Sequence, residues 1–411
     1  MAGHSLYICY FGLREPLVQT QVLPYLRELA KAGHRVALLT FESKTVDDKE
    51  SLTSDLKRDG IEWHHLKYHK RLSALATAWD IVQGARFVRR YIAAERPDIL
   101  HGRVHVPTLM AALARKFSRG KPKILFDIRG FFPEEYTDAG IWPENGLLYR
   151  SAKRVEKWLL NESDGFVVLT EKAREILFPE SRETGFDERR RPVEVIPCCV
   201  DISRFTSAND ESRARIRREL GIGQRYTLAY VGAFGGWYLT KETADLFGVL
   251  KRERPDAFAL VLTQSPREMI EPLLAERGYG PGDLFIAKVS PASIPEYLSA
   301  ADAAVSFIKA CYSKQASSPT KNAEYLACGL PIIANAGVGD VDDLIASHGV
   351  GQLVHALNDG GYHAALAGIG KLGDVRERCR STAEEQFDLV KVGGARYRRI
   401  YGRILALNIP E

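Results

Sequence analysis

A chain of 411 residues is too long for one ordinary hydrophobic core and fits two domains of roughly 200 residues each. Its 45% hydrophobic and 27% charged residues exclude a fibrous or largely disordered protein. The net charge of +5 is compatible with an anionic ligand or a membrane surface, and six cysteines without a CxxC pair exclude a disulfide framework.

The compartment is predicted from what the sequence lacks. The first residues show no basic region followed by a long apolar run, and no segment approaches the roughly 20 apolar residues of a membrane span. Reduced cysteines are typical of a cytoplasm. We therefore expect a cytoplasmic protein, with a peripheral contact at the inner face of the membrane as a further expectation.

The first half of the chain alternates strands with helices. The apolar patterns predict strands at Ser5–Phe11, Arg35–Phe41, Ile61–Leu66, Ile99–Gly102, Ile124–Asp127 and Gly165–Leu169, and helices at Gln19–Ala32, Val46–Arg58, Leu72–Glu95, Pro107–Phe117 and Leu147–Asn161. Such alternation predicts a mostly parallel sheet covered by helices on both faces.

A charged stretch near Glu180 interrupts this pattern before a strand at Val193–Ile196, and the alternation then restarts. We predict an α/β protein of two doubly wound, Rossmann-like domains facing a cleft, with domains at 1–196 and 197–385. A helical tail at 386–411 is expected to pack back on the first domain. In such sheets a ligand binds at the carboxyl ends of the strands.

The most informative stretch is SSPTKNAEYLACGLPIIANAGVGD, which begins at Ser317. It predicts a helix capped by Ser318, with Pro319 in its first position, and then a buried strand. Thr320 and Lys321 lie one turn before Glu324, near the positive end of the helix. This arrangement suits a diphosphate attached to a ribose, although a surface helix whose Lys and Glu only pair with each other explains the same residues.

Four segments show a resemblance to a known family. They are QTQVLPYLRELAKAGHRV from Gln19, VIPCCVDISRF from Val195, YVGAFGGWYLTK from Tyr230, and the stretch from Ser318 to Asp340. They resemble the GT-B glycosyltransferases of family 4, which transfer a sugar from a nucleotide-sugar donor with retention at the anomeric carbon. The resemblance implies that the first domain binds the acceptor and the second the donor. It implies no cofactor and no metal, because the nucleotide-sugar is a substrate.

The donor signature of the family has two glutamates, separated by seven residues. Glu324 matches the second, which in the family contacts the ribose of the donor. The first, which contacts the transferred sugar, falls on Ala316, so the sugar identity stays open. The loop after the preceding strand is expected to contribute Gly232 and Lys241, although Ala233 replaces the usual arginine and Lys241 comes late. Lys321 is the alternative partner for the diphosphate.

Candidate catalytic residues of the first domain end its strands. Asp127 and Arg129 stand where the family often has a His-Asp pair, and a local ion pair is the alternative reading. His101 and His105 are the other candidates. Gly12, after the first strand, is expected to let the chain approach the donor phosphates, although a lone glycine there also fits a simple turn.

We thus expect a retaining glycosyltransferase acting on a saccharide or lipid-linked acceptor in polysaccharide or glycolipid synthesis. A GT-B nucleotide-sugar epimerase and an inactive nucleotide-sugar-binding partner remain the alternatives. Basic residues within Tyr68–Arg90, namely Lys70, Arg71, Arg86, Arg89 and Arg90, fit either an anionic lipid contact or a solvated helix face. The sequence shows no basic stripe with stacking aromatic residues, so we do not expect nucleic acid as a partner.

Overall fold

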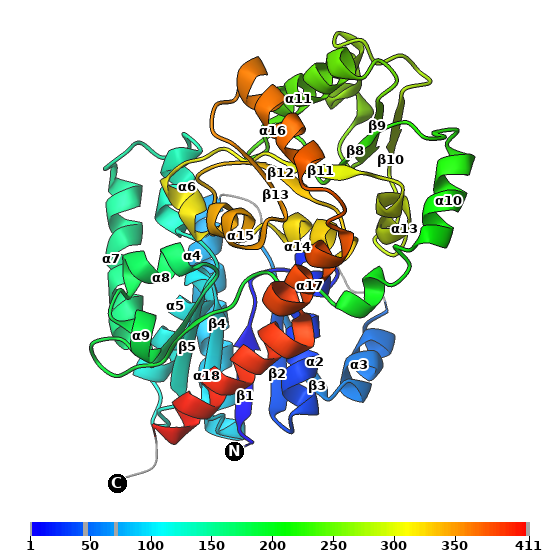
Figure 1. Ribbon diagram of the computed structural model, residues 1–411. Helices are drawn as coiled ribbons and strands as arrows, with labels where there is room; N and C mark the ends of the chain where they lie inside the picture. The colour runs from blue at the N-terminus through cyan, green and yellow to red at the C-terminus, as the bar shows by residue number, and fades with distance from the viewer. Residues whose placement is uncertain (1, 44–47, 70–72, 408–411) are drawn as a thin grey trace. The chain divides into compact units, whose positions relative to one another are not determined.

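The computed structural model describes residues 2–43, 48–69 and 73–407 and divides the chain into two compact units (Figure 1). Unit 1 comprises residues 1–197 together with 389–411, and unit 2 comprises 198–388. The sequence predicted domain boundaries between residues 196 and 197 and between residues 385 and 386, whereas the units of the structure meet between 197 and 198 and between 388 and 389.

Unit 1 is built on a parallel sheet of seven strands in the order β3-β2-β1-β4-β5-β6-β7. Ser5 of β1 pairs with Val36 on one side and with Ile99 on the other, so the strand order reverses at β1. Its elements are β1(His4–Ile8), α1(Pro16–Gln21), α2(Leu23–Lys31), β2(Arg35–Glu42), α3(Lys49–Arg58), β3(Ile61–Lys67), α4(Ser73–Glu95), β4(Ile99–Arg103), α5(His105–Lys116), β5(Lys123–Ile128), α6(Phe132–Asp138), α7(Leu147–Glu162), β6(Gly165–Val168), α8(Glu171–Leu177), α9(Ser181–Thr184), β7(Val193–Val195), the π-helical turn η4(Leu389–Gly394) and α18(Ala395–Ala406).

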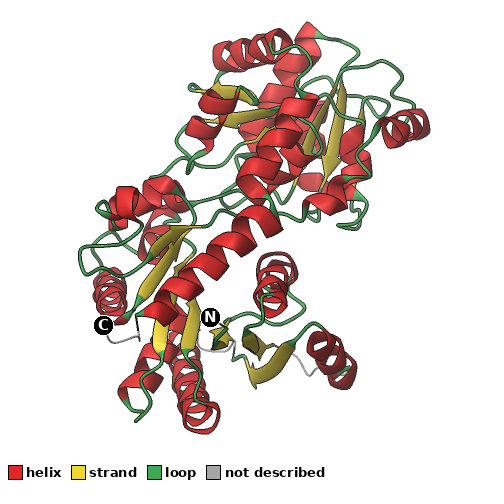
Figure 2. Ribbon diagram, turned by 60° about the horizontal axis from the view of Figure 1, so that its bottom comes forward, coloured by secondary structure: helices red, strands yellow, loops and turns green. Residues whose placement is uncertain are grey.

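Unit 2 repeats the design with a parallel sheet of six strands in the order β10-β9-β8-β11-β12-β13. Helices lie on both sides of each sheet (Figure 2). Its elements are η1(Ile202–Phe205), α10(Asp210–Glu219), β8(Thr227–Val231), α11(Thr240–Glu253), β9(Phe258–Leu262), η2(Arg267–Met269), α12(Glu271–Ala275), β10(Leu284–Ala287), α13(Ile294–Ser299), β11(Ala303–Ser306), η3(Tyr312–Ala316), α14(Thr320–Ala327), β12(Ile332–Asn335), α15(Val341–His348), β13(Gly351–Val354), α16(Asp359–Lys371) and α17(Arg376–Phe387).

Strand β8 shows why this sheet is buried on both faces. All its residues are apolar or buried, and successive side chains point to opposite faces of the sheet. Leu228 and Tyr230 join the core on one face, whereas Ala229 and Val231 join the core on the other. The two faces are covered by different helices, among them α11 and α16 on the first and α14 and α17 on the second.

One predicted helix is divided in two. The expected helix Gln19–Ala32 is broken at Val22, where α1 ends and α2 begins. Pro24 occupies the first turn of α2, a position that tolerates the missing N–H. The break therefore follows from a proline that cannot continue the helix of α1.

Candidate functional site

The candidate site lies in unit 2 where β8 ends and α14 begins. After β8 the chain turns at Gly232, whose φ of +133° is a conformation that L side chains rarely adopt. A Cβ atom on Gly232 would lie 3.0 Å from the Lys321 Nζ atom. The glycine therefore gives the ammonium group of α14 room to lie against the backbone of the loop.

Lys321 is buried and its ammonium group lies over two aromatic rings. The Nζ atom is 4.3 Å from the ring centre of Tyr230 and 4.3 Å from that of Tyr238. In the described chain no hydrogen-bond acceptor and no carboxylate pairs with it. Burial lowers the pKa of Lys321 to about 7, against a smaller opposing effect of Glu324. A cation held this way costs folding free energy unless a ligand completes its environment.

Glu324 lies one turn after Lys321 on the same helix but forms no ion pair with it within the described residues. This excludes the reading in which the two side chains only pair with each other. Burial raises the pKa of Glu324 to about 7, while Arg204 and Lys321 act in the opposite direction. Both groups therefore titrate near neutral pH.

The start of α14 differs from the sequence prediction. The helix begins at Thr320, and Pro319 is its N-cap residue without a side-chain cap. The expected cap, Ser318, instead uses its Oγ atom to accept a hydrogen bond from the Cys198 N–H at 3.0 Å. The prediction of Ser318 as the cap and Pro319 as the first helical residue is therefore wrong, because a tertiary contact takes the hydroxyl.

The missing cap leaves backbone donors at the helix start. In the part of the chain that the structure describes, the N–H groups of Thr320 and Lys321 have no acceptor, whereas Asn322 donates to the Pro319 carbonyl. Such donors, together with the helix dipole, attract an anion. A buried cation and two free N–H groups thus lie at one helix terminus.

Sequence reasoning missed two contributors to this region, Asn322 and Tyr238. In the described part of unit 2, the buried polar side chains with unpartnered atoms are Ser306, Lys321, Asn322 and Tyr362. Both polar atoms of Asn322 are in this group, directly beside Lys321. Tyr238, whose ring is the second beneath the ammonium group, is the other contributor. The sequence pointed to Tyr238 only through its place in the loop YVGAFGGWYLTK.

Within unit 2 the structure does not bring the Lys241 side chain to Lys321. Lys241 lies in the first turn of α11, pairs with Asp245 at 3.0 Å, and its side chain is 72% exposed. Gly12 belongs to unit 1, where a Cβ atom would lie 2.8 Å from a carboxylate oxygen of Glu42. The Glu42 carboxylate also accepts a hydrogen bond from the Leu13 N–H at 2.8 Å, so this backbone donor is not free to bind a phosphate.

Asp127 and Arg129 lie in a buried polar cluster of unit 1. The Asp127 carboxylate is fully buried and accepts a hydrogen bond from the Tyr397 hydroxyl of α18 at 2.9 Å. Burial favours the neutral acid, but Arg129, His101 and Arg103 together lower the pKa of Asp127 to about 2. Arg129 lies 3.7 Å from the carboxylate.

This cluster anchors the tail of the chain. Tyr401, also from α18, lies within 3.0 Å of the His101 Nδ1 atom. Helix α18 thus covers the Asp127 carboxylate at the end of β5. His105 is likewise occupied, since its Nε2 atom lies 3.0 Å from Glu156.

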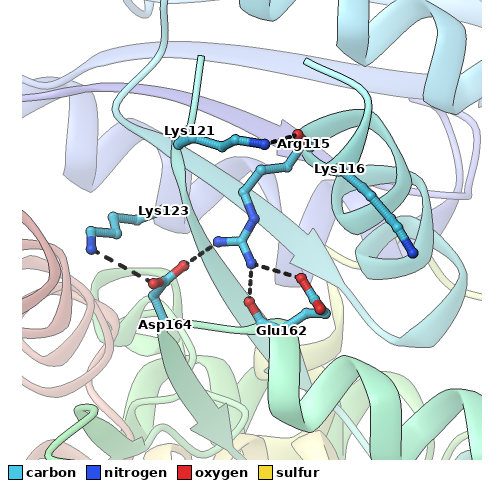
Figure 3. A pocket seen from close by; sticks show the side chains of 6 residues that line it. All are labelled: Arg115, Lys116, Lys121, Lys123, Glu162 and Asp164. Atoms are coloured by element: carbon cyan, nitrogen blue, oxygen red, sulfur yellow. Dashed lines mark hydrogen bonds and ion pairs between the residues drawn. The ribbon is translucent and has the colours of Figure 1, made fainter. Parts of the chain in front are cut away.

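A shallow pocket of unit 1 lies elsewhere, at the amino ends of β5 and β6, with a volume of about 390 Å³ (Figure 3). Arg115 contacts Asp164 at 2.6 Å and Glu162 at 3.2 Å, and Lys123 lies 3.7 Å from Asp164. Both acids of the pocket are thus paired with basic side chains. Among the described residues no group of three His, Cys, Asp or Glu side chains is placed to hold a metal ion.

Family comparisons cover both units of the chain. The family described as Glycosyltransferase Family 4 matches residues 18–204, and the family described as Glycosyl transferases group 1 matches residues 212–386. The chain belongs to the GT-B glycosyltransferases of family 4 type. It is therefore an enzyme of the glycosyltransferase class. A comparison with curated proteins finds no match.

Solved structures share the fold at low sequence identity. A glycosyltransferase from Rickettsia africae is 16% identical, with a TM-score of 0.71, over 98% of this chain and 99% of that one. Anabaena Alr3699/HepE, in complex with UDP and glucose, is 12% identical with a TM-score of 0.67, over 97% and 100%. WaaG, a glycosyltransferase of lipopolysaccharide biosynthesis, is 16% identical with a TM-score of 0.64, over 97% and 100%.

Proposed function

We propose that this glycosyltransferase uses a nucleoside-diphosphate sugar and transfers the sugar, with retention, to a hydroxyl of a saccharide or lipid-linked acceptor. The observation that carries the proposal is the buried Lys321 ammonium group beside the free N–H groups of α14. A diphosphate would supply the missing anionic partner. The Anabaena neighbour, whose fold is shared, was solved with UDP and glucose. The acceptor belongs to polysaccharide or glycolipid synthesis in this proposal, and the reaction takes place in the cytoplasm.

In the proposed reaction the bond between the anomeric carbon and the donor phosphate oxygen breaks. A bond from that carbon to the acceptor oxygen forms on the same face of the sugar, and the hydroxyl proton passes to the leaving phosphate. Negative charge grows on the diphosphate as its bond breaks, so Lys321 and the N–H groups of Thr320 and Lys321 stabilise the transition state. Glu324 accepts hydrogen bonds from the ribose hydroxyls.

The role of Lys321 requires proton uptake. In the free protein the ammonium group loses its proton readily, because its pKa is about 7. A bound diphosphate places negative charge beside it and raises that pKa, so the complex holds the proton at neutral pH. Donor binding is therefore coupled to protonation of Lys321.

The test begins with a thermal-shift screen of nucleoside diphosphates and their sugars, because a ligand of the folded state raises the melting temperature. The best donor is then used with the wild type, Lys321→Ala and the control Lys371→Ala, which removes an exposed lysine from the last turn of α16. We expect Lys321→Ala to reduce turnover about 100-fold, as for other lost transition-state donors, and the control to be unchanged. Equal turnover in all three proteins would refute the assignment.

The same donor distinguishes the alternatives. Without acceptor, a transferase leaves the donor sugar chemically unchanged apart from slow hydrolysis, whereas an epimerase produces a new sugar nucleotide. A partner protein that only binds would show the thermal shift without either reaction. Ala316, which is buried at the end of η3, stands where the family has its first signature glutamate. Because of this replacement, a protein that only binds the donor is one of the outcomes that the experiment must distinguish.

A further inference from the structure

Helix α4 of unit 1 carries a carboxylate on its buried face. Asp80 is fully buried, and the residues that share its face, Ala76, Gly84 and Val88, are buried and apolar. A carboxylate in such surroundings costs folding free energy unless hydrogen bonds satisfy it. The partners of Asp80 therefore deserve description.

Three donors satisfy the Asp80 carboxylate, and two of them belong to His69. The His69 backbone N–H and the Tyr10 hydroxyl donate to the Oδ2 atom at 3.0 and 2.6 Å. The His69 Nδ1 atom lies 2.5 Å from the Oδ1 atom. Because an ionised carboxylate only accepts hydrogen bonds, Nδ1 carries the proton in this contact. The neutral imidazole of His69 therefore has its lone pair on Nε2.

The other edge of this imidazole is open. The His69 side chain is 37% exposed, whereas the Asp80 side chain is 0% exposed. Among the residues that the structure describes, none forms a hydrogen bond or ion pair with Nε2 of His69. A buried carboxylate behind a histidine fixes the tautomer and the orientation of the ring, which is how proteins prepare a histidine to act on a ligand. The contact also ties the segment after β3 to α4, but that role leaves Nε2 unused.

The His69–Asp80 pair lies where the strands of unit 1 end. His69 follows the last residue of β3 by two positions, and Tyr10 follows the last residue of β1 by two. The Tyr10 ring packs edge-on against Phe41 of β2 and against Tyr68, with ring centres 4.9 and 5.2 Å apart. Parallel sheets bind ligands at this edge, and aromatic surface beside a few fixed polar groups is the usual lining of a ligand site.

We propose that His69 is an acceptor-binding residue, whose Nε2 atom accepts a hydrogen bond from a hydroxyl group of a neutral saccharide. Asp80 acts as a positioning residue that holds the imidazole in the required tautomer. The half-buried Tyr68 ring adds apolar surface at the same edge. This inference rests on the proposed function, because the saccharide is the acceptor of that reaction.

The charge of the pair favours a hydroxyl group over an anion as the ligand. An imidazole attracts an anion only when it is protonated. In His69 the buried Asp80 carboxylate already partners that positive charge at Nδ1. The neutral ring, in contrast, offers the Nε2 lone pair to any hydroxyl donor. We therefore infer a neutral saccharide rather than one that carries a phosphate or a carboxylate.

The pair lies within Tyr68–Arg90, the stretch whose cations the sequence analysis named. Arg86, Arg89 and Arg90 are exposed on α4, whereas Lys70 and Arg71 lie outside the described residues. The lipid contact of these cations stays a prediction. No helix of the described chain has the length and apolarity to cross a bilayer. His69 and Asp80 were not predicted as a pair, because a separation of 11 residues across a loop follows no helical or strand period.

Nuclear magnetic resonance of the full chain tests the site directly, with nitrogen-labelled histidine and His69→Gln for the assignment. The probes are the neutral methyl glycosides of glucose, galactose and mannose, with glucuronate as the anionic comparison, and uridine diphosphate is present throughout. We expect Nε2 of His69 to be unprotonated in the neutral ring and its signal to move when at least one neutral glycoside is added.

The pH dependence gives the sign of the interaction. The affinity for the glycoside should fall about tenfold between about pH 8 and about pH 5, because protonation of His69 removes the Nε2 lone pair. The titratable groups that face His69 are Asp80 and, through Asp80, Tyr10, with Tyr68 beside it in the chain. Burial and the contact with Asp80 raise the pKa of Tyr10, so this hydroxyl stays neutral over the range.

Three variants separate ligand binding from a purely structural role. His69→Ala should lose about tenfold in glycoside affinity together with the pH dependence, whereas His69→Gln, which keeps an acceptor oxygen, should lose less and be insensitive to pH. The matched control is His363→Ala, which removes an exposed imidazole that lies 2.5 Å from Glu253 in unit 2, and it should match the wild type. All four proteins should bind uridine diphosphate equally.

A His69 signal that responds to no neutral glycoside would overturn the proposal. An affinity that rises as the pH falls would do the same, because the ligand would then be an anion held by the imidazolium. In the transfer assay with the same glycosides, His69→Ala should raise the acceptor KM about tenfold and leave the donor KM unchanged. An acceptor KM equal to that of the wild type refutes the role of His69 alone. A wild type that binds glycosides at His69 but transfers no sugar refutes the proposed function and leaves the binding site supported.

Discussion

Replacing Lys321 by methionine should stabilise the free protein while removing its ability to bind a nucleoside diphosphate. Methionine keeps a long, flexible side chain against Tyr230 and Tyr238 but removes the buried charge. The ammonium group has no hydrogen-bond partner among the described residues, so only the two aromatic rings and the smaller effect of Glu324 offset the cost of burying it.

The magnitude follows from the pKa. The folded-state pKa of Lys321 is about 7 against 10.5 for the unfolded chain. At pH 7 the difference corresponds to about 4 kcal/mol of free energy of unfolding that the wild type lacks. The variant should therefore melt about 10 °C higher at this pH.

The sign of the pH dependence gives an independent check. Between pH 7 and 10.5 the unfolded chain binds more protons at Lys321 than the folded chain does, so wild-type stability should rise with pH in this window. In Lys321→Met this rise should be absent. Urea denaturation at several pH values, with and without uridine diphosphate, measures both effects.

A Lys321→Met variant that is less stable than the wild type at pH 7 would contradict this prediction. The prediction would also be contradicted if uridine diphosphate raised the melting temperature of the two proteins equally. Lys371→Met serves as the control, because it removes an exposed lysine from the same unit. Its stability and ligand response should match those of the wild type.

Three further predictions concern named contacts. Glu324→Gln should weaken donor binding about tenfold at neutral pH, as measured by calorimetry, and it should remove the loss of affinity expected from protonation of the Glu324 carboxylate below about pH 7, leaving the opposite effect of Lys321 protonation; a pH profile identical to that of the wild type would contradict the ribose role. Tyr397→Phe should destabilise unit 1 by about 2 kcal/mol in urea denaturation, since it removes a hydrogen bond to the buried Asp127 carboxylate. The pKa of Asp127 is lowered to about 2 in the folded protein, against 3.8 for the unfolded chain. The ionised carboxylate therefore stabilises the fold above pH 3.8, and this stability is lost as the pH falls toward 2. Gly232→Ala should cost about 2 kcal/mol through its positive φ and crowd the Lys321 ammonium group, lowering the donor kcat/KM while far-ultraviolet circular dichroism stays unchanged.

The architecture could be predicted because alternating apolar strands and amphipathic helices dictate a doubly wound sheet. The run TLAYV has four apolar residues after a threonine, and all five are buried in β8, as expected of a strand covered on both faces. Lys321 and Glu324 could be predicted as a pair because their spacing places them on one face of a helix.

What failed depended on contacts between distant segments. Ser318 has the chemistry of a helix cap, but the backbone of Cys198 takes its hydroxyl. Asp127 ends a strand as predicted, yet Tyr397, which lies 270 residues later in the chain, covers it. Tyr238 contacts Lys321 because the loop after β8 folds back, and no periodicity encodes such a turn.

The most direct measurement is the titration of the Lys321 side chain by nuclear magnetic resonance, with nitrogen-labelled lysine and Lys321→Met for the assignment. We expect a pKa of about 7 in the free protein and a clear increase when uridine diphosphate binds, because the ligand supplies the missing anionic partner. An ordinary lysine pKa near 10.5 in the free protein, or a pKa that does not respond to the ligand, would contradict it.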